Sequence, residues 1–227
     1  MNIFSRHKAG IGLAFGLLLF GYIAREVIEG DSQSFDRRIL LSMRHGGDYS
    51  PLGPRWLQES ARDITGLGGI AELALITTFV ACFLVLDGKR RMALFVAGSV
   101  ASGLLISNLL KEAFHRARPD LVPHGAYVYT SSFPSGHSML SAVTYLTLGA
   151  VLARSQKRRR MKAFFLCIAA FLSLLVGVTR VYLGVHWPTD VVAGWAAGAV
   201  WAILCWLCAG WLQVHRTIER EGESSEL

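Results

Sequence analysis

The chain has 227 residues, of which 52% are hydrophobic and only 17% are charged, and its formal net charge is +7. This balance excludes an ordinary soluble domain and predicts a membrane protein. The basic residues form no continuous face, so we expect no nucleic-acid partner.

Six apolar blocks are close in length to the roughly 20 residues that a helix needs to cross a hydrocarbon core of about 30 Å. They cover residues 9–28, 67–86, 92–110, 138–153, 163–182 and 191–212. The fourth block, of sixteen residues, spans only if Gly136 and His137 extend it. We therefore predict an all-α polytopic membrane fold with six transmembrane helices in one domain, residues 1–215.

The first block has a basic start that also suits a signal peptide, but no small-residue cleavage site follows it cleanly, since residues 21–25 read GYIAR. We favour a retained helix. Segment 29–66 then carries Phe35, Ile39, Leu40 and Met43 at helical spacing, which predicts a short interfacial helix on the outer side.

Basic residues are dense in the short turns on one side of the predicted bundle. Thirteen of the 23 Lys and Arg residues lie there: Arg6, Lys8, Lys89, Arg90, Arg91, Arg154, Lys157, Arg158, Arg159, Arg160, Lys162, Arg216 and Arg220. Density near helix ends orients helices, so we place both termini, including a polar tail at 216–227, in the cytoplasm.

The cysteines lie inside apolar blocks, which indicates packing and no disulfide framework. They are Cys82, Cys167, Cys205 and Cys208. The last two form a CxxC, but one pair within a lipid-facing helix does not predict a metal site.

Three polar clusters fall on the predicted outer side. In "KEAFHRARP", Lys111 and Arg118 are two helical turns apart and project from nearly the same face, although both could simply snorkel to the interface. In "PSGH", Pro134 suits a first helical turn, and Ser135 and Gly136 leave backbone N–H groups for an anion, with a capped helix as the alternative.

The third cluster is "TRVYLGVHWPTD". Arg180 ends the fifth block, and Asp190 follows His186 by four residues, so the carboxylate can reach one imidazole nitrogen and leave the other as a lone pair. A helix-capping Asp beside a His is the alternative. Together the clusters supply cations, amides, two histidines and a carboxylate on one face, an inventory for phosphoryl transfer.

These residues resemble the type 2 phosphatidic acid phosphatase superfamily, which also includes the vanadium haloperoxidases. The resemblance covers residues 111–190: K, six residues and RP at 111–119, PSGH at 134–137, and R, five residues, H, three residues and D at 180–190. The family often has Ser before the third-motif arginine, where this chain has Thr179.

The resemblance implies a nucleophile, His186, that forms a phosphohistidine, an orienting Asp190, and an acid, His137, that protonates the departing oxygen. It also implies that the cations and the helix start bind the phosphate oxygens. These residues are Lys111, Arg118, Ser135, Gly136 and Arg180. No metal or other cofactor is implied.

Six spans argue against the soluble haloperoxidase branch. They favour an amphiphilic phosphate ester as the substrate. The expected partners are therefore the bilayer and a lipid phosphate. We expect a phosphatase of the cytoplasmic membrane with an extracytoplasmic site, acting on phosphatidic acid, phosphatidylglycerophosphate or a polyprenyl diphosphate. A phosphotransferase, or a transporter or scaffold that binds anionic lipid, is an alternative. The lipid and the oligomeric state are left open.

Overall fold

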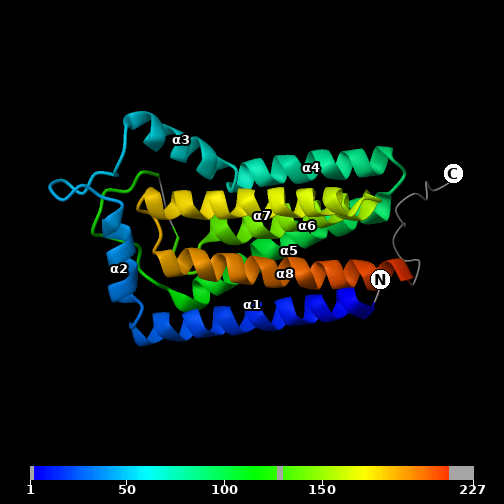
Figure 1. The fold of residues 1–227 in the computed structure, drawn as a ribbon, viewed down its shortest axis with the longest axis horizontal. Coiled ribbons are helices and arrows are strands. Elements are labelled where there is room, and N and C mark those ends of the chain that lie inside the picture. The colour runs from blue at the N-terminus through cyan, green and yellow to red at the C-terminus, as the bar shows by residue number, and fades with distance from the viewer. Residues whose placement is uncertain (1–2, 127–129, 215–227) are drawn as a thin grey trace.

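The computed structural model describes residues 3–126 and 130–214, and within these ranges it has eight helices and no β-strand (Figure 1). The helices are α1 (Ile3–Glu29), α2 (Gln33–Ser42), α3 (Arg55–Gly66), α4 (Ile70–Leu86), α5 (Arg90–Phe114), α6 (Gly136–Ser155), α7 (Arg159–Tyr182) and α8 (Pro188–Val214). The predicted all-α class is confirmed. The predicted tail at 216–227 lies outside the described residues.

Five of the described helices are long and apolar enough to cross a membrane: α1, α5, α6, α7 and α8. The predicted span at 67–86 instead falls on α4, which has 17 residues and meets α3 at a 49° bend. Six spans result if α3 and α4 count as one broken span. The helices α1, α4 and α5 expose large apolar side chains such as Phe15, Phe79 and Leu94, as expected for a lipid-facing surface.

The bend between α3 and α4 lies at Gly68 and Gly69. A Cβ atom on Gly68 would lie 2.4 Å from Cγ1 of Val176 on α7, so only glycine lets the chain pass this close. The chain therefore turns at residues 67–69 before α4 begins, which is why the sequence pattern placed the start of the span too early.

The bundle is built around α6. In its most apolar window, 61% of the residues are buried, against 17% for α1. The helix α8 approaches α6 through Gly194 and Gly198, where added Cβ atoms would lie 2.7 Å from the carbonyl oxygen of Ser135 and 2.5 Å from that of Met139. This small-xxx-small spacing lets two backbones approach closely inside a bilayer.

The spans alternate in direction, so the end of α5, the start of α6, the end of α7 and the start of α8 lie at the same end of the bundle (Figure 1). The helix α2 lies across this end, and α1 begins and α8 ends at the opposite one. The basic turns before α5 and α7 lie at that opposite end as well. The structure thus separates a motif-bearing end from a densely basic end.

The helix predicted at residues 35–43 is present as α2, but most of its apolar side faces the protein. Leu40 is fully buried in a cluster with Val122, Val181 and Val191, and Ile39 and Met43 pack against that cluster. Phe35 remains 53% exposed. The helix therefore docks onto the end of the bundle, and only one turn presents an aromatic side chain outward.

Candidate active site

All three sequence clusters meet at the end of the bundle that α2 crosses. Lys111 is in the last turn of α5, and the PSGH segment, residues 134–137, begins α6. Arg180 is in the last turn of α7, and the tight turn to α8 carries His186 and leads to Asp190. The antiparallel order of the spans produces this convergence, as the charge pattern predicted.

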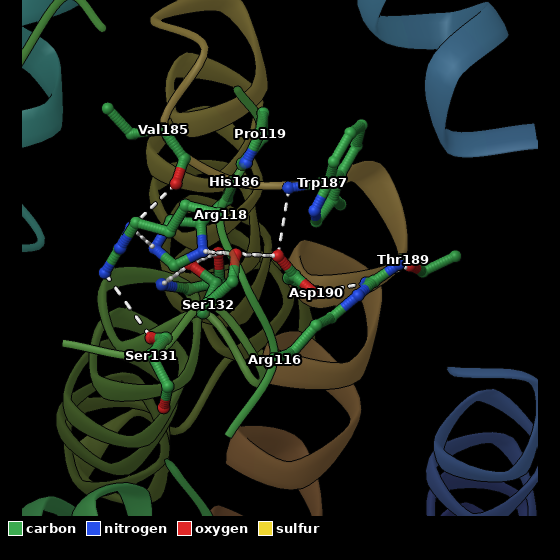
Figure 2. A network of polar contacts seen from close by, with 12 residues as sticks. Arg116, Arg118, Pro119, Ser131, Ser132, Val185, His186, Trp187, Thr189 and Asp190 are labelled. Atoms are coloured by element: carbon green, nitrogen blue, oxygen red, sulfur yellow. Dashed lines mark hydrogen bonds and ion pairs between the residues drawn. The ribbon is translucent and has the colours of Figure 1, made fainter. Parts of the chain in front are cut away.

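The imidazole of His186 lies between an acid and a cation. Its side chain is almost fully buried. Nδ1 lies 3.5 Å from Oδ2 of Asp190 and 3.4 Å from Oγ of Ser132, whereas Nε2 lies 3.2 Å from Nη1 of Arg118 (Figure 2). The ring therefore turns Nε2 toward the guanidinium of Arg118 and keeps Nδ1 on the carboxylate side.

Asp190 is completely buried, and several donors surround its carboxylate (Figure 2). The hydroxyl of Ser132 and the backbone N–H of Trp187 donate to Oδ2, the latter at 2.9 Å, and Arg116 donates to Oδ1 at 2.5 Å. The predicted contact with His186 is present at 3.5 Å, longer than these bonds. Asp190 is thus fixed chiefly by groups other than the imidazole.

Two of the predicted cations are held by the segment that precedes α6. Lys111 donates from Nζ to the carbonyl of Ser131 at 2.8 Å, and Arg118 donates from Nε to the carbonyl of Thr130 at 2.7 Å. A further bond of 2.7 Å joins Nη1 of Arg118 to the carbonyl of Val185, next to the histidine. These bonds to neutral carbonyls position both charges without neutralising them.

The third predicted cation, Arg180, is held from α3. It is 3% exposed, and its Nη1 donates to Oγ1 of Thr65 at 3.0 Å. Its buried Nε has no hydrogen-bond partner among the described residues. A buried guanidinium with an unused donor favours binding of an anion.

At the start of α6, one predicted anion donor is already engaged. The backbone N–H of Ser135 donates to the carbonyl of Asp190 at 3.0 Å, and its hydroxyl accepts from the N–H of Ser138 as an N-cap. Gly136 lies against Lys111, whose Cε would be 3.2 Å from a Cβ atom there. The expectation that Ser135 offers a free amide is therefore wrong, and Gly136 remains the candidate.

His137 follows Gly136 on α6 and is half-buried at the same end of the bundle. Its backbone carbonyl lies 3.2 Å from the position of a Cβ atom on Gly68, so the α3–α4 break covers it. The hydroxyl of Thr179, the departure from the family pattern, bonds back to the carbonyl of Val176 on its own helix. That bond keeps the hydroxyl out of the cluster.

Three polar residues that hold Asp190 and its neighbours were not predicted from the sequence: Ser132, Arg116 and Asp36. Ser132 stands beside the PSGH segment and Arg116 within the first motif, so their positions in the chain were available as a signal. Asp36 was hidden, because its contact with Arg116 joins residues 80 positions apart.

Burial and charge keep His186 neutral. Burial is the main cause that lowers the pKa of its imidazole well below the ordinary value of 6.5, and the positive charges of Arg118, Arg180 and Lys111 lower it further. A neutral ring has a lone pair available for attack on phosphorus.

Among residues 3–126 and 130–214, no group of three or more His, Cys, Asp and Glu side chains could hold a metal ion.

The PAP2 superfamily matches residues 92–213, more than half of the chain. The chain belongs to this superfamily. Phosphatidylglycerophosphatase B of Bacillus subtilis (strain 168) is 33% identical over 144 residues, which are 63% of this chain and 70% of that protein. Lipid A 1-phosphatase of Rhizobium johnstonii is 37% identical over 114 residues, 46% of this chain and 42% of that protein.

The fold has a solved counterpart of nearly equal length. The crystal structure of a transmembrane PAP2-type phosphatidylglycerolphosphate phosphatase from Bacillus subtilis matches with a TM-score of 0.72 at 27% identity. The match covers 94% of this chain and 98% of that one. This PAP2 superfamily member is therefore an integral membrane protein with the fold of its structural neighbour.

Removal of the nearest cation should raise the pKa of His186. In Arg118→Gln the neighbouring positive charge disappears, so we expect the imidazole to take up its proton at a higher pH than in the wild type. The ring ¹⁵N shifts of labelled protein in detergent, assigned with His186→Gln, measure this titration. Arg38→Gln, an exposed arginine of α2, should leave it unchanged. An unchanged titration in Arg118→Gln contradicts the proposed electrostatics.

Proposed function

We propose that this PAP2 superfamily member hydrolyses lipid phosphate esters or diphosphates through a phosphohistidine on His186. The observation that carries the proposal is the position of Nε2 of His186, 3.2 Å from Arg118, with Asp190 on the other side of the ring. An imidazole placed between a phosphate-binding cation and a buried carboxylate suits nucleophilic attack on phosphorus.

In the first step, Nε2 of His186 attacks phosphorus, an N–P bond forms, and the bond from phosphorus to the lipid oxygen breaks. Lys111, Arg118 and Arg180 hold the other phosphate oxygens, and the N–H of Gly136 adds a donor at the start of α6. His137 gives its proton to the departing oxygen, because an alkoxide leaves poorly without one.

In the second step, water attacks phosphorus and the N–P bond breaks, which releases phosphate and restores neutral His186. His137, which has lost its proton, accepts one from the attacking water. Asp190 stabilises the positive charge that the histidine ring carries between the two steps. The three cations and the N–H of Gly136 supply the charge stabilisation, so the mechanism we propose uses no metal ion.

A lipid phosphate fits the surroundings of the site. The motif-bearing end lies at the ends of helices that expose apolar side chains, so lipid tails can stay in the bilayer while the phosphate enters. Phosphatidylglycerophosphatase B and lipid A 1-phosphatase are similar proteins that are named for lipid phosphates. We therefore propose phosphatidylglycerophosphate, phosphatidic acid or a polyprenyl diphosphate as the substrate class.

For orientation, we propose that the site faces the extracytoplasmic side of the cytoplasmic membrane. The turns before α5 and α7 carry dense Lys and Arg residues and lie at the end opposite the motifs. Such turns stay in the cytoplasm.

Loss of either histidine should strongly slow phosphate release. With purified protein and a panel of lipid mono- and diphosphates in a chelator, we expect His186→Ala to lower kcat/KM by roughly 10³-fold or more. His137→Ala should lower it by roughly 10²- to 10⁴-fold, the range of general acid catalysis. The control is His45→Ala, an exposed histidine of the outer loop, which should keep full activity.

The same assay separates the alternatives. Transfer of phosphate to an added lipid acceptor in place of water would identify a phosphotransferase. Binding of lipid phosphate without turnover by the folded wild type would contradict the enzyme and favour a transporter or scaffold.

Accessible cysteines should test the orientation. The substitution Gly47→Cys is made in a chain whose native cysteines have been replaced. Gly47 lies in the loop between α2 and α3 at the motif-bearing end, and no other atom lies near its Cβ position. A membrane-impermeant maleimide should label it in intact cells, whereas Arg160→Cys at the start of α7 should react only after permeabilisation. The reverse pattern would place the site in the cytoplasm.

A further inference from the structure

Arg116 occupies the centre of a buried ionic network that joins α2 to α8. Its Nη2 donates to Oδ2 of Asp36 at 2.7 Å and to Oγ of Ser32 at 3.1 Å. Its Nη1 donates to Oγ1 of Thr189 at 2.8 Å and to Oδ1 of Asp190 at 2.5 Å. One guanidinium therefore binds two carboxylates that are both completely buried.

The second carboxylate also holds the first turn of α8. Asp36 accepts from the backbone N–H of Thr189 at 2.9 Å and from its hydroxyl at 2.7 Å. Thr189 directly precedes Asp190 in the sequence. The helix α2 thereby fixes both the backbone beside Asp190 and the arginine that binds its side chain.

We propose that Asp36, Arg116 and Thr189 form a positioning relay, through which α2 sets the orientation and charge of Asp190 and so of His186. The relay rests on the function proposed above, because it acts on the same histidine.

The geometry separates Arg116 from the phosphate-binding cations. Both terminal nitrogens of Arg116 are occupied by protein oxygens, and the guanidinium lies 5.7 Å from the centre of the Trp187 ring. By contrast, Lys111 and Arg118 are held by neutral carbonyls. Arg116 therefore has its charge balanced inside the protein and acts on the reaction through Asp190.

The relay also explains how the buried carboxylate of Asp190 can stay ionised beside a neutral His186. A buried carboxylate is costly unless it is paired and hydrogen-bonded. Arg116 donates to Oδ1 of Asp190, and Ser132 and the N–H of Trp187 donate to Oδ2. Hydrogen bonds to a carboxylate favour its charged form, so these donors stabilise the anion while the imidazole beside Oδ2 is neutral. The anion is then in place when phosphorylation gives the ring a positive charge.

The test is a double-mutant cycle with Arg116→Gln and Asp190→Asn, read as kcat and KM on a lipid phosphate that the wild type hydrolyses. We expect Arg116→Gln to lower kcat by about 10- to 100-fold, the usual effect of a group that orients a site residue, with little change in KM. In the Asp190→Asn background the same change should have almost no effect, because the relay acts through that carboxylate.

Two further variants keep the test decisive if Arg116→Gln does not fold. Asp36→Asn preserves the shape of the side chain, and we expect a loss of kcat that again disappears in Asp190→Asn. Arg116→Lys keeps the charge but not the planar fork that spans both carboxylates, so it should restore only part of the activity. The matched controls, Asp31→Asn and Arg38→Gln, change exposed residues near or on α2 and should retain wild-type kcat.

A readout without turnover separates the relay from the proposed function. The ring ¹⁵N shifts of His186 should change in Arg116→Gln and in Asp36→Asn. If the wild type releases no phosphate while these shifts change, the function fails and the relay stands. Equal losses in both backgrounds, a raised KM with unchanged kcat, or unchanged ring shifts would each overturn the relay.

Discussion

The structure of the site depends on one buried carboxylate. Asp190 is inaccessible to solvent, and it is held by the hydroxyl of Ser132, the backbone of Trp187 and the guanidinium of Arg116. Its own backbone carbonyl accepts a hydrogen bond from the N–H of Ser135, the N-cap residue of α6. A single residue at the start of α8 therefore fixes the histidine turn and the entry to α6.

This arrangement requires that α6 and α8 approach closely. Gly194 and Gly198 allow that approach, since side chains at either position would meet the backbone of α6. Within a bilayer such packing supplies the attraction between helices that the hydrophobic effect does not. The small residues of the apolar region thus let α6 and α8 pack closely, and this packing places the PSGH segment next to the His186 turn.

Local motifs and charge density predicted much of this architecture. The ends of the spans could be placed because apolar length and basic turns are properties of short segments, and the three motifs then had to meet at one end. The break at Gly68 was missed because it depends on a contact with Val176 in another helix.

The role of α2 was equally hidden from the sequence. Its apolar spacing predicted a helix, but the same spacing suits a membrane interface and a protein surface. Asp36 reveals the difference, because it bonds to Thr189, 153 residues later in the chain. Such a pairing follows from the docking of α2 on the bundle, which no local pattern encodes. The prediction of a free amide at Ser135 was wrong for the same reason. Its N–H donates to the carbonyl of Asp190, which is distant in the sequence.

The central proposal is that the phosphoryl group is transferred to His186 before it is transferred to water. Brief mixing with a lipid substrate labelled in its phosphate, followed by an alkaline quench and peptide mapping, tests this claim most directly. We expect label on the peptide that contains His186, stable in alkali and lost in acid, and no label in His186→Gln. Full turnover without any label on that peptide would contradict it and would indicate direct attack by water.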